Sequence, residues 1–312
     1  MNLTKLENIC QAYHMQLAKN ISLAQHTTFR IGGNAAFWIE ICSAKGLGEI
    51  LKFCHESQTD YFVIGRGSNI LASDQGYPGL ILHLGNEFSG IQQQDNSLIC
   101  ESGAMLTNIA KFAMQHALTG MEALSGIPGT IGGALFMNAG AYGSEMKDIV
   151  TQCRYLDKSG MEHTLDAQDL DLAYRHSFFT EHDHTIITSV TIRLTPGNPE
   201  EIAAQTADYA QRRKTKQPLN YPSAGSTFKR PQGSYASKLI DDCGLKGYSV
   251  GGAQISEKHA GFVINTGNAS CRNVLALCRH VQQIVSEKTG YFLELEPVFL
   301  GIRELDGEIA CS

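Results

Sequence analysis

The feature that most constrains this chain is a glycine-dense segment that is also hydrophobic. Six glycines fall within eighteen residues of one another: Gly126, Gly129, Gly132, Gly133, Gly140 and Gly143. A flexible linker would be polar, whereas this segment also holds Ile127, Ile131, Leu135, Phe136 and Met137. Glycines in such a setting indicate backbone that approaches another group closely. Two interpretations are open: a large, flat cofactor lies against this backbone, or the protein packs tightly against itself here.

A second loop of small residues follows a predicted strand. In YFVIGRGSNIL (61–71), the apolar run ends abruptly in Gly65, Arg66, Gly67, Ser68 and Asn69. This start resembles a dinucleotide-binding fingerprint, but the third glycine is missing and a turn and another strand follow instead of a helix. The context therefore argues against a Rossmann fold. What remains is either an ordinary tight loop or a loop whose main-chain amides hold a pyrophosphate.

Composition excludes several classes of function. The 312 residues are 43% hydrophobic, enough to bury the cores of two or three domains, and Lys plus Arg number 25 against 31 acids. This balance argues against nucleic-acid binding. No apolar run approaches the ~18 residues of a membrane span, and the N-terminal MNLTKLENICQAYH has the pattern of an amphipathic helix instead of a signal peptide. Nine cysteines without a CxxC pattern indicate reduced thiols and no metal site. We therefore expect a cytoplasmic protein with no nucleic-acid or membrane partner.

The pattern of predicted secondary structure changes near Pro196. Residues 29–195 are rich in strand and turn signals, with helices expected after Ser43 and from about Thr107 to Gly120. After Pro196, helices beginning near Asn198, Ser234 and Arg272 alternate with strands. We expect an α+β protein with a lead-in (1–28), a first domain (29–195) in two lobes (29–85 and 86–195), a second α+β domain (196–302) and a tail (303–312).

Three side chains are candidates for catalysis: Arg175 in YRHSFF, Ser226 in SAGSTFKRP and Glu296 in LELEPVFLG. Ser226 lies in a Gly-rich turn close to two cations, where a hydroxyl can donate a proton or bind an anion. Each residue also has an ordinary explanation. An arginine beside a tyrosine is commonly a rim residue, a turn serine commonly bonds its own backbone, and Glu296 follows an alternating pattern that faces solvent.

Seven motifs, in order along nearly the whole chain, carry a family resemblance: HTTFRIGG, VIGRGSNIL, SGIPGTIGGALFMNAGAYG, YRHSFF, SAGSTFKRP, GGAQISEKHAGFVIN and LELEPVFLG. Together they resemble the UDP-N-acetylenolpyruvoylglucosamine reductase family. That family uses FAD and NADPH to reduce UDP-N-acetylglucosamine enolpyruvate to UDP-N-acetylmuramate for peptidoglycan. The resemblance implies a two-part FAD-binding domain of the vanillyl-alcohol oxidase and p-cresol methylhydroxylase type, followed by an α+β substrate-binding domain.

The resemblance also implies site residues. The cofactor-binding residues lie in the two glycine loops and just after them: Gly65, Arg66, Gly67, Ser68, Asn69, Ser125, Gly126, Gly129, Thr130, Gly133, Asn138 and Gly140. The catalytic residues are Arg175, Ser226 and Glu296, and the substrate-binding residues are Tyr142, Lys216 and Lys229.

The implied reaction passes hydride from NADPH through the flavin to the enolpyruvyl methylene carbon. Arg175, with Glu296 if that carboxyl is protonated, would stabilise the developing charge, and Ser226 would then protonate the α-carbon. The fifty residues between Arg175 and Ser226 match the shorter form of the family, which lacks a tyrosine-bearing loop. Arg230 stands where one form has asparagine, so that substrate contact is not carried over.

We expect a monomer. Two alternatives are open: another flavin-dependent oxidoreductase that shares only the FAD domain, and a non-catalytic protein that binds flavin or a nucleotide sugar.

Overall fold

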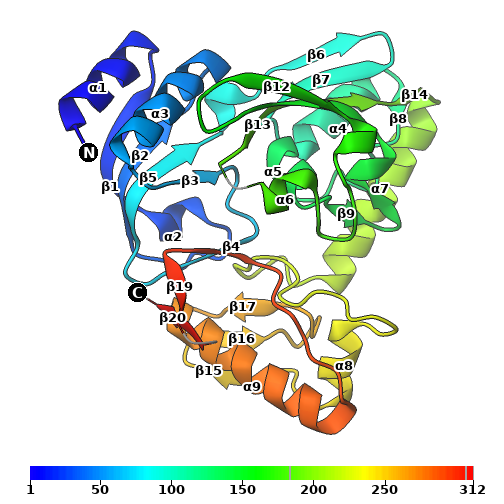
Figure 1. Ribbon diagram of the computed structural model, residues 1–312. Coiled ribbons are helices and arrows are strands. Elements are labelled where there is room, and N and C mark those ends of the chain that lie inside the picture. The colour runs from blue at the N-terminus through cyan, green and yellow to red at the C-terminus, as the bar shows by residue number, and fades with distance from the viewer. Residues whose placement is uncertain (183, 306–307, 312) are drawn as a thin grey trace. The chain divides into compact units, whose positions relative to one another are not determined.

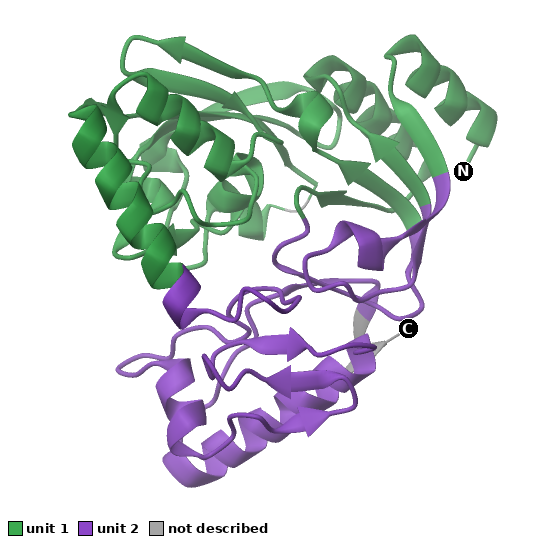
Figure 2. Ribbon diagram, turned by 180° about the vertical axis from the view of Figure 1, so that it is seen from behind, with its two compact units in different colours: residues 1–18, 37–66, 79–213 green, residues 19–36, 67–78, 214–312 purple. Residues whose placement is uncertain are grey.

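The computed structural model describes residues 1–182, 184–305 and 308–311. Two compact units make up the chain (Figure 2): unit 1 is Met1–Ala18, Phe37–Arg66 and Gly79–Arg213, and unit 2 is Lys19–Ala36, Gly67–Pro78 and Lys214–Ser312. Unit 2 therefore includes two short stretches from the first third of the chain. The functional domain ranges 29–195 and 196–302 remain a prediction.

A four-stranded sheet, mostly from unit 1, forms the first layer of that unit. Its strand order is β1-β2-β5-β3, and β3 pairs in parallel with β5. The sheet packs with two helices around one core (Figure 1). Ser43 accepts a hydrogen bond from the amide of Gly46 (3.1 Å) and starts the second helix, as predicted from the sequence. The elements are α1 (Leu3–Ala12), β1 (Gln16–Ser22), β2 (Asn34–Glu40), α3 (Ala44–Ser57), β3 (Tyr61–Ile64) and β5 (Tyr77–His83).

A five-stranded antiparallel sheet forms the second layer of unit 1, in the order β12-β11-β13-β7-β6. Cys153, Val190 and Cys100 pair across its three central strands, and all three are buried. One face therefore packs with α4 and α5 in a second core. The elements are β6 (Ile91–Gln94), β7 (Ser97–Glu101), α4 (Leu106–Gln115), α5 (Ile131–Phe136), β11 (Val150–Leu156), β12 (Glu162–Asp166) and β13 (Ile186–Arg193).

Helix α4 corrects one expectation. The sequence predicted a helix reaching Gly120, but α4 ends at Gln115, because Ala117 adopts a left-handed φ of 54°. Short elements complete unit 1: β8 (Leu118–Thr119), β9 (Gly140–Ala141), β10 (Ser144–Glu145), α6 (Phe178–Glu181), β14 (Thr195–Pro196) and the 3₁₀ turns η1 (Asn86–Phe88), η2 (Met146–Asp148) and η3 (Ala167–Asp169).

Unit 2 has its own core between a three-stranded sheet, β15-β16-β17, and helices α8 and α9. Helix α9 starts with a Ser270–Asn273 capping box and ends at Gly290, with φ of 74°. Parallel pairing of β4 with β18 adds a two-stranded sheet. The elements are α2 (Leu23–His26), β4 (Ile70–Ala72), α8 (Ala236–Asp242), β15 (Ser249–Val250), β16 (Ala253–Ile255), β17 (Val263–Asn265), α9 (Cys271–Thr289), β18 (Val298–Leu300), β19 (Ile302–Leu305) and β20 (Glu308–Cys311).

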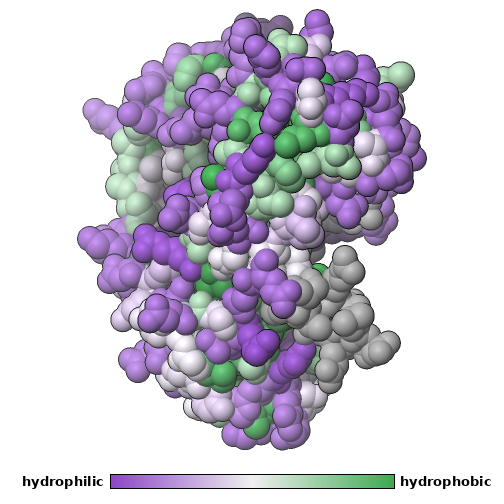
Figure 3. Space-filling view, turned by 90° about the vertical axis from the view of Figure 1, so that its left-hand side faces the viewer, coloured by the Kyte–Doolittle hydropathy of each residue, from purple (hydrophilic) through white to green (hydrophobic). Residues whose placement is uncertain are grey.

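Helix α7 (Pro199–Lys216) connects the chain of unit 1 to that of unit 2, and Asn198 caps it through a hydrogen bond from the Glu200 amide (2.9 Å). The predicted tail (303–312) includes positions 306, 307 and 312, which lie outside the described residues. Within the described part of the chain, no helix is both long enough and apolar enough to cross a membrane. The face drawn in Figure 3 mixes hydrophilic and hydrophobic residues.

Candidate active site

Helix α5 begins inside the glycine-dense segment, where the sequence predicted no helix. Thr130 is its N-cap residue and accepts a long hydrogen bond from the amide of Gly133 (3.4 Å). The amides of Ile131 and Gly132 donate to the carbonyls of Ala104 (2.8 Å) and Ser102 (3.0 Å). The start of α5 is therefore held against the chain that follows β7.

The space around the glycines differs from position to position. A Cβ on Gly132 would lie 1.8 Å from Ser102 Oγ, and one on Gly126 would lie 2.7 Å from Arg213 Nε. At these two positions the protein packs tightly against itself. In contrast, a Cβ on Gly133 would meet its nearest atom, Thr130 Oγ1, at 3.6 Å. The main chain at Gly133 therefore has room beside it for another group.

Gly65, the first residue of one glycine loop, meets the other glycine loop at Thr130, and both residues belong to unit 1. A Cβ on Gly65 would lie 2.4 Å from Thr130 Oγ1, although the two residues are far apart in the sequence. Glycine at position 65 thus allows the end of β3 to touch the cap of α5. Small residues, main-chain groups and the Thr130 hydroxyl gather at one place, and Gly133 leaves space beside them. This donor set fits a pyrophosphate-bearing cofactor such as FAD.

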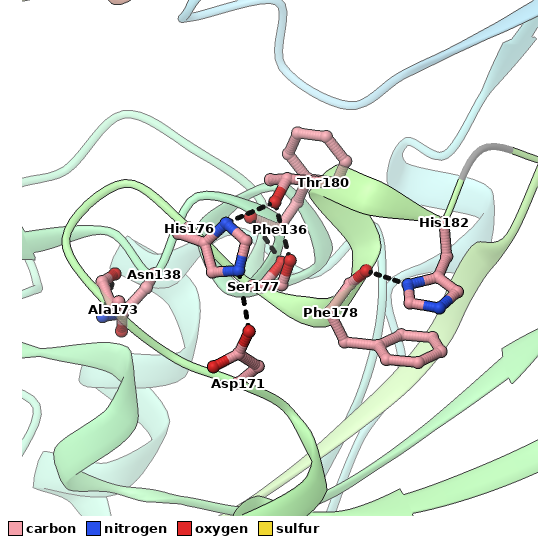
Figure 4. Close-up of polar contacts among 9 residues, drawn as sticks. All are labelled: Phe136, Asn138, Asp171, Ala173, His176, Ser177, Phe178, Thr180 and His182. Carbon is pink, nitrogen blue, oxygen red and sulfur yellow. Dashed lines mark hydrogen bonds and ion pairs between the residues drawn. The ribbon is translucent and has the colours of Figure 1, made fainter.

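Asn138, another predicted cofactor residue, has its side chain engaged inside the protein. It is fully buried, and its Nδ2 donates to the Ala173 carbonyl (2.9 Å) and to Glu145 Oε2 (3.1 Å). Its Oδ1 accepts a hydrogen bond from the amide of Lys147 (2.9 Å). The Asn138 side chain therefore joins the glycine-dense segment to the chain that carries Arg175 (Figure 4).

Arg175 lies in a tight reversal of unit 1. Ala173 and His176 exchange main-chain hydrogen bonds of 3.2 Å each, and Arg175 between them has a left-handed φ of 55°. Its guanidinium lies 5.0 Å from the ring centroid of Tyr174. The hydrogen bond from Lys147 lowers the pKa of the Glu145 carboxyl, and the charge of Arg175 contributes to the same shift. Arg175 is thus close enough to the buried Asn138 network to act on it electrostatically.

Ser226 and Glu296 lie on paired segments of unit 2. Gly225, with φ of 78°, turns the chain before Ser226, and the buried Thr227 follows it. The Thr227 carbonyl accepts a hydrogen bond from the amide of Glu296 (3.0 Å). The structure therefore pairs the two segments that carry these predicted catalytic residues, although they are far apart in the sequence.

Three further hydrogen bonds hold these segments. The Thr227 amide donates to the Gly261 carbonyl (2.8 Å), and its Oγ1 accepts a hydrogen bond from the Val263 amide (3.0 Å). On the other side, Asn69 Nδ2 donates to the main-chain carbonyl of Glu296 (3.2 Å). The main chain of Glu296 is thus bonded at both its N–H and its carbonyl group.

The predicted substrate-binding residues divide between the units. Tyr142 in unit 1 stacks on Tyr209 with 4.8 Å between ring centroids, and Arg213 lies 5.8 Å from the Tyr142 centroid. In unit 2, Lys229 forms an ion pair with Glu294 (3.2 Å), and the exposed Lys216 is the last residue of α7.

Sequence reasoning did not single out several residues that support these positions. Burial lowers the pKa of the Arg213 guanidinium, and the only signal for Arg213 was the basic end of α7. Glu145 and Thr227 gave no separate signal, because their roles depend on hydrogen bonds between segments. Arg175 belongs to unit 1, whereas Ser226 and Glu296 belong to unit 2. Among the described residues, no group of His, Cys, Asp or Glu is arranged to hold a metal ion.

Comparison with known proteins defines the class first. Residues 36–166 match the family model of an FAD-binding domain. Together with the glycine loops that meet at Gly65 and Thr130, this defines the chain as a flavoprotein with an FAD-binding domain followed by a second domain. Residues 217–300 match the C-terminal domain of UDP-N-acetylenolpyruvoylglucosamine reductase.

Whole-chain comparisons then define the family. A UDP-N-acetylenolpyruvoylglucosamine reductase of Caldanaerobacter subterraneus subsp. tengcongensis is 45% identical, with 94% of this chain and 95% of that protein covered. The enzyme of that name from Lachnoclostridium phytofermentans is 42% identical, with coverage of 96% and 97%. The crystal structure of the reductase (MurB) from Thermus caldophilus has a TM-score of 0.78 at 33% identity and covers 92% of this chain and 99% of its own. The chain belongs to the UDP-N-acetylenolpyruvoylglucosamine reductase family, and both the resemblance and the expected fold class are confirmed.

Proposed function

We propose that this protein reduces UDP-N-acetylglucosamine enolpyruvate to UDP-N-acetylmuramate, with FAD as cofactor and NADPH as the electron donor. Membership of the family over 94% of the chain supports the substrate class. The observation that carries the chemistry is the hydrogen bond from the Glu296 amide to the Thr227 carbonyl (3.0 Å), which pairs the Ser226 segment with the Glu296 segment. An FAD enzyme of another specificity would not need this pair.

In this proposal, the two glycine loops hold FAD. Its pyrophosphate would lie against the main chain of the loop at Gly65 to Asn69 and of the segment from Ser125 to Gly133. Thr130 and Gly133 supply the hydroxyl and the open backbone there. When bound, FAD supplies a two-electron carrier between NADPH and the enolpyruvyl group.

The protein's own residues stabilise the developing charge and donate the proton. Gain of hydride at the methylene carbon places negative charge on the neighbouring carboxylate, which the fixed positive charge of Arg175 stabilises. Glu296, in its protonated form, would donate a hydrogen bond to the same group. The enolic intermediate of the substrate is basic enough to take a proton from a weak acid, and Ser226 Oγ–H donates that proton to the α-carbon.

The remaining assignments follow from the family. Tyr142, Lys216 and Lys229 would bind the substrate. The two lysines would form ion pairs with its anionic groups. The product would serve peptidoglycan precursor synthesis, and through it cell-wall biogenesis, cell shape and division. We propose a cytoplasmic monomer of the shorter form of the family.

Replacement of Ser226 by alanine tests the function and the proton donor together. Flavin reduction by NADPH should stay near the wild-type rate, because that step does not need the Ser226 proton. Reoxidation of the flavin by the enolpyruvyl substrate should slow by ~10²-fold or more, as expected for a lost general acid. Anaerobic stopped-flow absorbance of the flavin measures both rates.

The matched control is Ser223→Ala in the same turn. Ser223 Oγ accepts a long hydrogen bond from the Gly225 amide (3.4 Å), so its loss should leave both rates near wild type. Slowing of flavin reduction alone in Ser226→Ala would count against the proton-donor role. A wild-type protein that NADPH reduces but the substrate never reoxidises would favour the flavin-dependent alternative, and one that NADPH never reduces would favour a binding protein.

A further inference from the structure

The chain around Arg175 is attached to the glycine-dense segment at a serine. Ser177 is fully buried, and its hydroxyl donates to the carbonyl of Phe136, the last residue of α5, at 2.7 Å. The Ser177 carbonyl in turn accepts a hydrogen bond from Thr180 Oγ1 (2.7 Å) in α6. Ser177 therefore connects the end of α5 to the start of α6 (Figure 4).

Asn138 makes the second attachment, on the other side of Arg175. Its Nδ2 donates to the Ala173 carbonyl (2.9 Å), and Asn138 follows Phe136 by two residues. One short stretch at the end of α5 thus holds the chain both before and after Arg175. A hydrogen bond between His176 Nε2 and Asp171 Oδ2 (3.0 Å) closes the base of the same loop.

Between these attachments Arg175 has a left-handed φ of 55°. This conformation is unfavourable for a non-glycine residue and persists only where the surroundings hold it. The backbone conformation also sets the direction in which a side chain leaves the chain. If the attachments were lost, the loop would relax and the guanidinium would leave its present position.

We propose that Ser177 and Asn138 are positioning residues that hold Arg175 in its left-handed conformation and so aim its guanidinium at the substrate carboxylate. This inference rests on the proposed function for the role of Arg175. The attachments themselves are independent of it. A charge-stabilising group contributes to rate only when it is fixed where the charge develops.

The kinetic test is Ser177→Ala. Ser57→Ala is the matched control, because Ser57 Oγ also donates to a main-chain carbonyl, that of Phe53, at 2.7 Å, but within helix α3. We expect Ser177→Ala to slow flavin reoxidation by the substrate about 10-fold at saturating substrate, with little change in flavin reduction by NADPH. Ser57→Ala should leave both rates near wild type. Equal slowing of both half-reactions, or no slowing, in Ser177→Ala would overturn the proposal.

A double-mutant cycle separates positioning from general stability. In an Arg175→Ala background, loss of the guanidinium should itself slow reoxidation by ~10²-fold or more, and Ser177→Ala should then add little, because it acts through Arg175. A further 10-fold loss in that background would show that Ser177 acts independently of Arg175.

Limited trypsin digestion tests the attachments without any activity. Trypsin cleaves after arginine, so freeing the loop should raise cleavage after Arg175 severalfold in Ser177→Ala and in Asn138→Gly, relative to wild type and Ser57→Ala. Glycine is chosen at position 138 because Asn138 itself has a positive φ of 40°. Unchanged cleavage in both variants would overturn the inference. The wild-type protein could fail to react with the substrate while cleavage still rises in the two variants. That result would contradict the proposed function but would support the role of the two attachments.

Discussion

Gly132 and Gly133 are neighbours in α5 that meet opposite surroundings. Gly132 lies where a Cβ would be 1.8 Å from Ser102 Oγ, 3.0 Å from Ser102 Cβ and 3.1 Å from the Ser102 carbonyl oxygen. Rotation of the serine hydroxyl relieves only the first of these contacts. Gly133 instead has its nearest atom at 3.6 Å. Single residues in one motif can thus be required by folding or by a ligand, and only their surroundings distinguish the two.

This difference predicts opposite effects for two alanine variants. Gly132→Ala should destabilise the flavin-free protein by about 1–3 kcal/mol through overpacking. Gly133→Ala should keep or slightly raise that stability, because alanine favours a helix by roughly 0.5–1 kcal/mol over glycine. If the Gly133 backbone lies against FAD, this variant should still lose flavin more readily. Urea unfolding of the flavin-free protein measures the two stabilities, and the absorbance of the purified variants measures how much flavin each retains. Full flavin retention in Gly133→Ala would show that Gly133 is not part of the cofactor site.

At the scale of elements, helix α9 depends on a residue far from it in the sequence. The carboxylate of Asp74 accepts hydrogen bonds from the amides of Cys271 (2.7 Å) and Arg272 (3.1 Å), in addition to the local capping box of Ser270 and Asn273. A negative charge there also complements the helix dipole. The stretch 67–78 therefore contributes directly to the longest helix of unit 2.

Removal of this cap should weaken unit 2. Asp74→Ala should lower the free energy of unfolding by about 1 kcal/mol, with 2 kcal/mol as the upper end for caps. Asp208→Asn is the control, since Asp208 forms an exposed ion pair with Arg212 on α7, and such pairs contribute little. Urea denaturation gives the energies, and faster amide hydrogen exchange at residues 271–273 would locate the loss. Unchanged exchange there would contradict the capping role.

Some helices could be predicted from residues close to them in the sequence, and others could not. Helices α3, α7 and α9 follow caps at Ser43, Asn198 and Ser270, so their starts depend on nearby residues. Helix α5 was missed, because its glycines disfavour a helix locally and its amides are held by Ala104 and Ser102. Long-range contacts overrode propensity there.

At the scale of the whole molecule, the cores enclose most of the thiols. None of the described cysteines forms a disulfide, and burial raises the pKa of Cys10 to about 11 and those of Cys54, Cys100, Cys153 and Cys278 to about 12. These residues come from all three cores of the two units. The thiols should therefore react slowly with thiol reagents while the protein is folded.

This burial predicts alkaline destabilisation. An unfolded thiol has a pKa of about 8.5, so above that pH the unfolded chain loses protons that the folded protein keeps. The contribution of the buried thiols to the free energy of unfolding is fully present below about pH 8.5. It is lost as the pH rises toward the pKa of the folded thiols, by up to ~1.4 kcal/mol per pH unit for each such thiol. Urea unfolding at pH 7.5, 9 and 10 should show the decline, and Cys278→Ala should make it shallower. Stability that stays level over this range would contradict it.

The sequence by itself determined the family, the α+β class and the identity of the candidate residues. Motifs such as SAGSTFKRP and YRHSFF keep residue type and spacing together, and these are local properties. The same holds for the helix caps at Ser43 and Asn198, whose partners lie within a few residues.

Only the tertiary structure decided which of those residues are neighbours and what each is bonded to. The sequence could not distinguish Gly132 from Gly133, nor show that Thr227 joins Ser226 to Glu296. It could not show that the side chain of Asn138, which stays a predicted cofactor residue, bonds to Ala173, Glu145 and Lys147. The physical reason is the same in each case: contacts between distant segments depend on how the cores pack, and no short stretch of sequence contains that information.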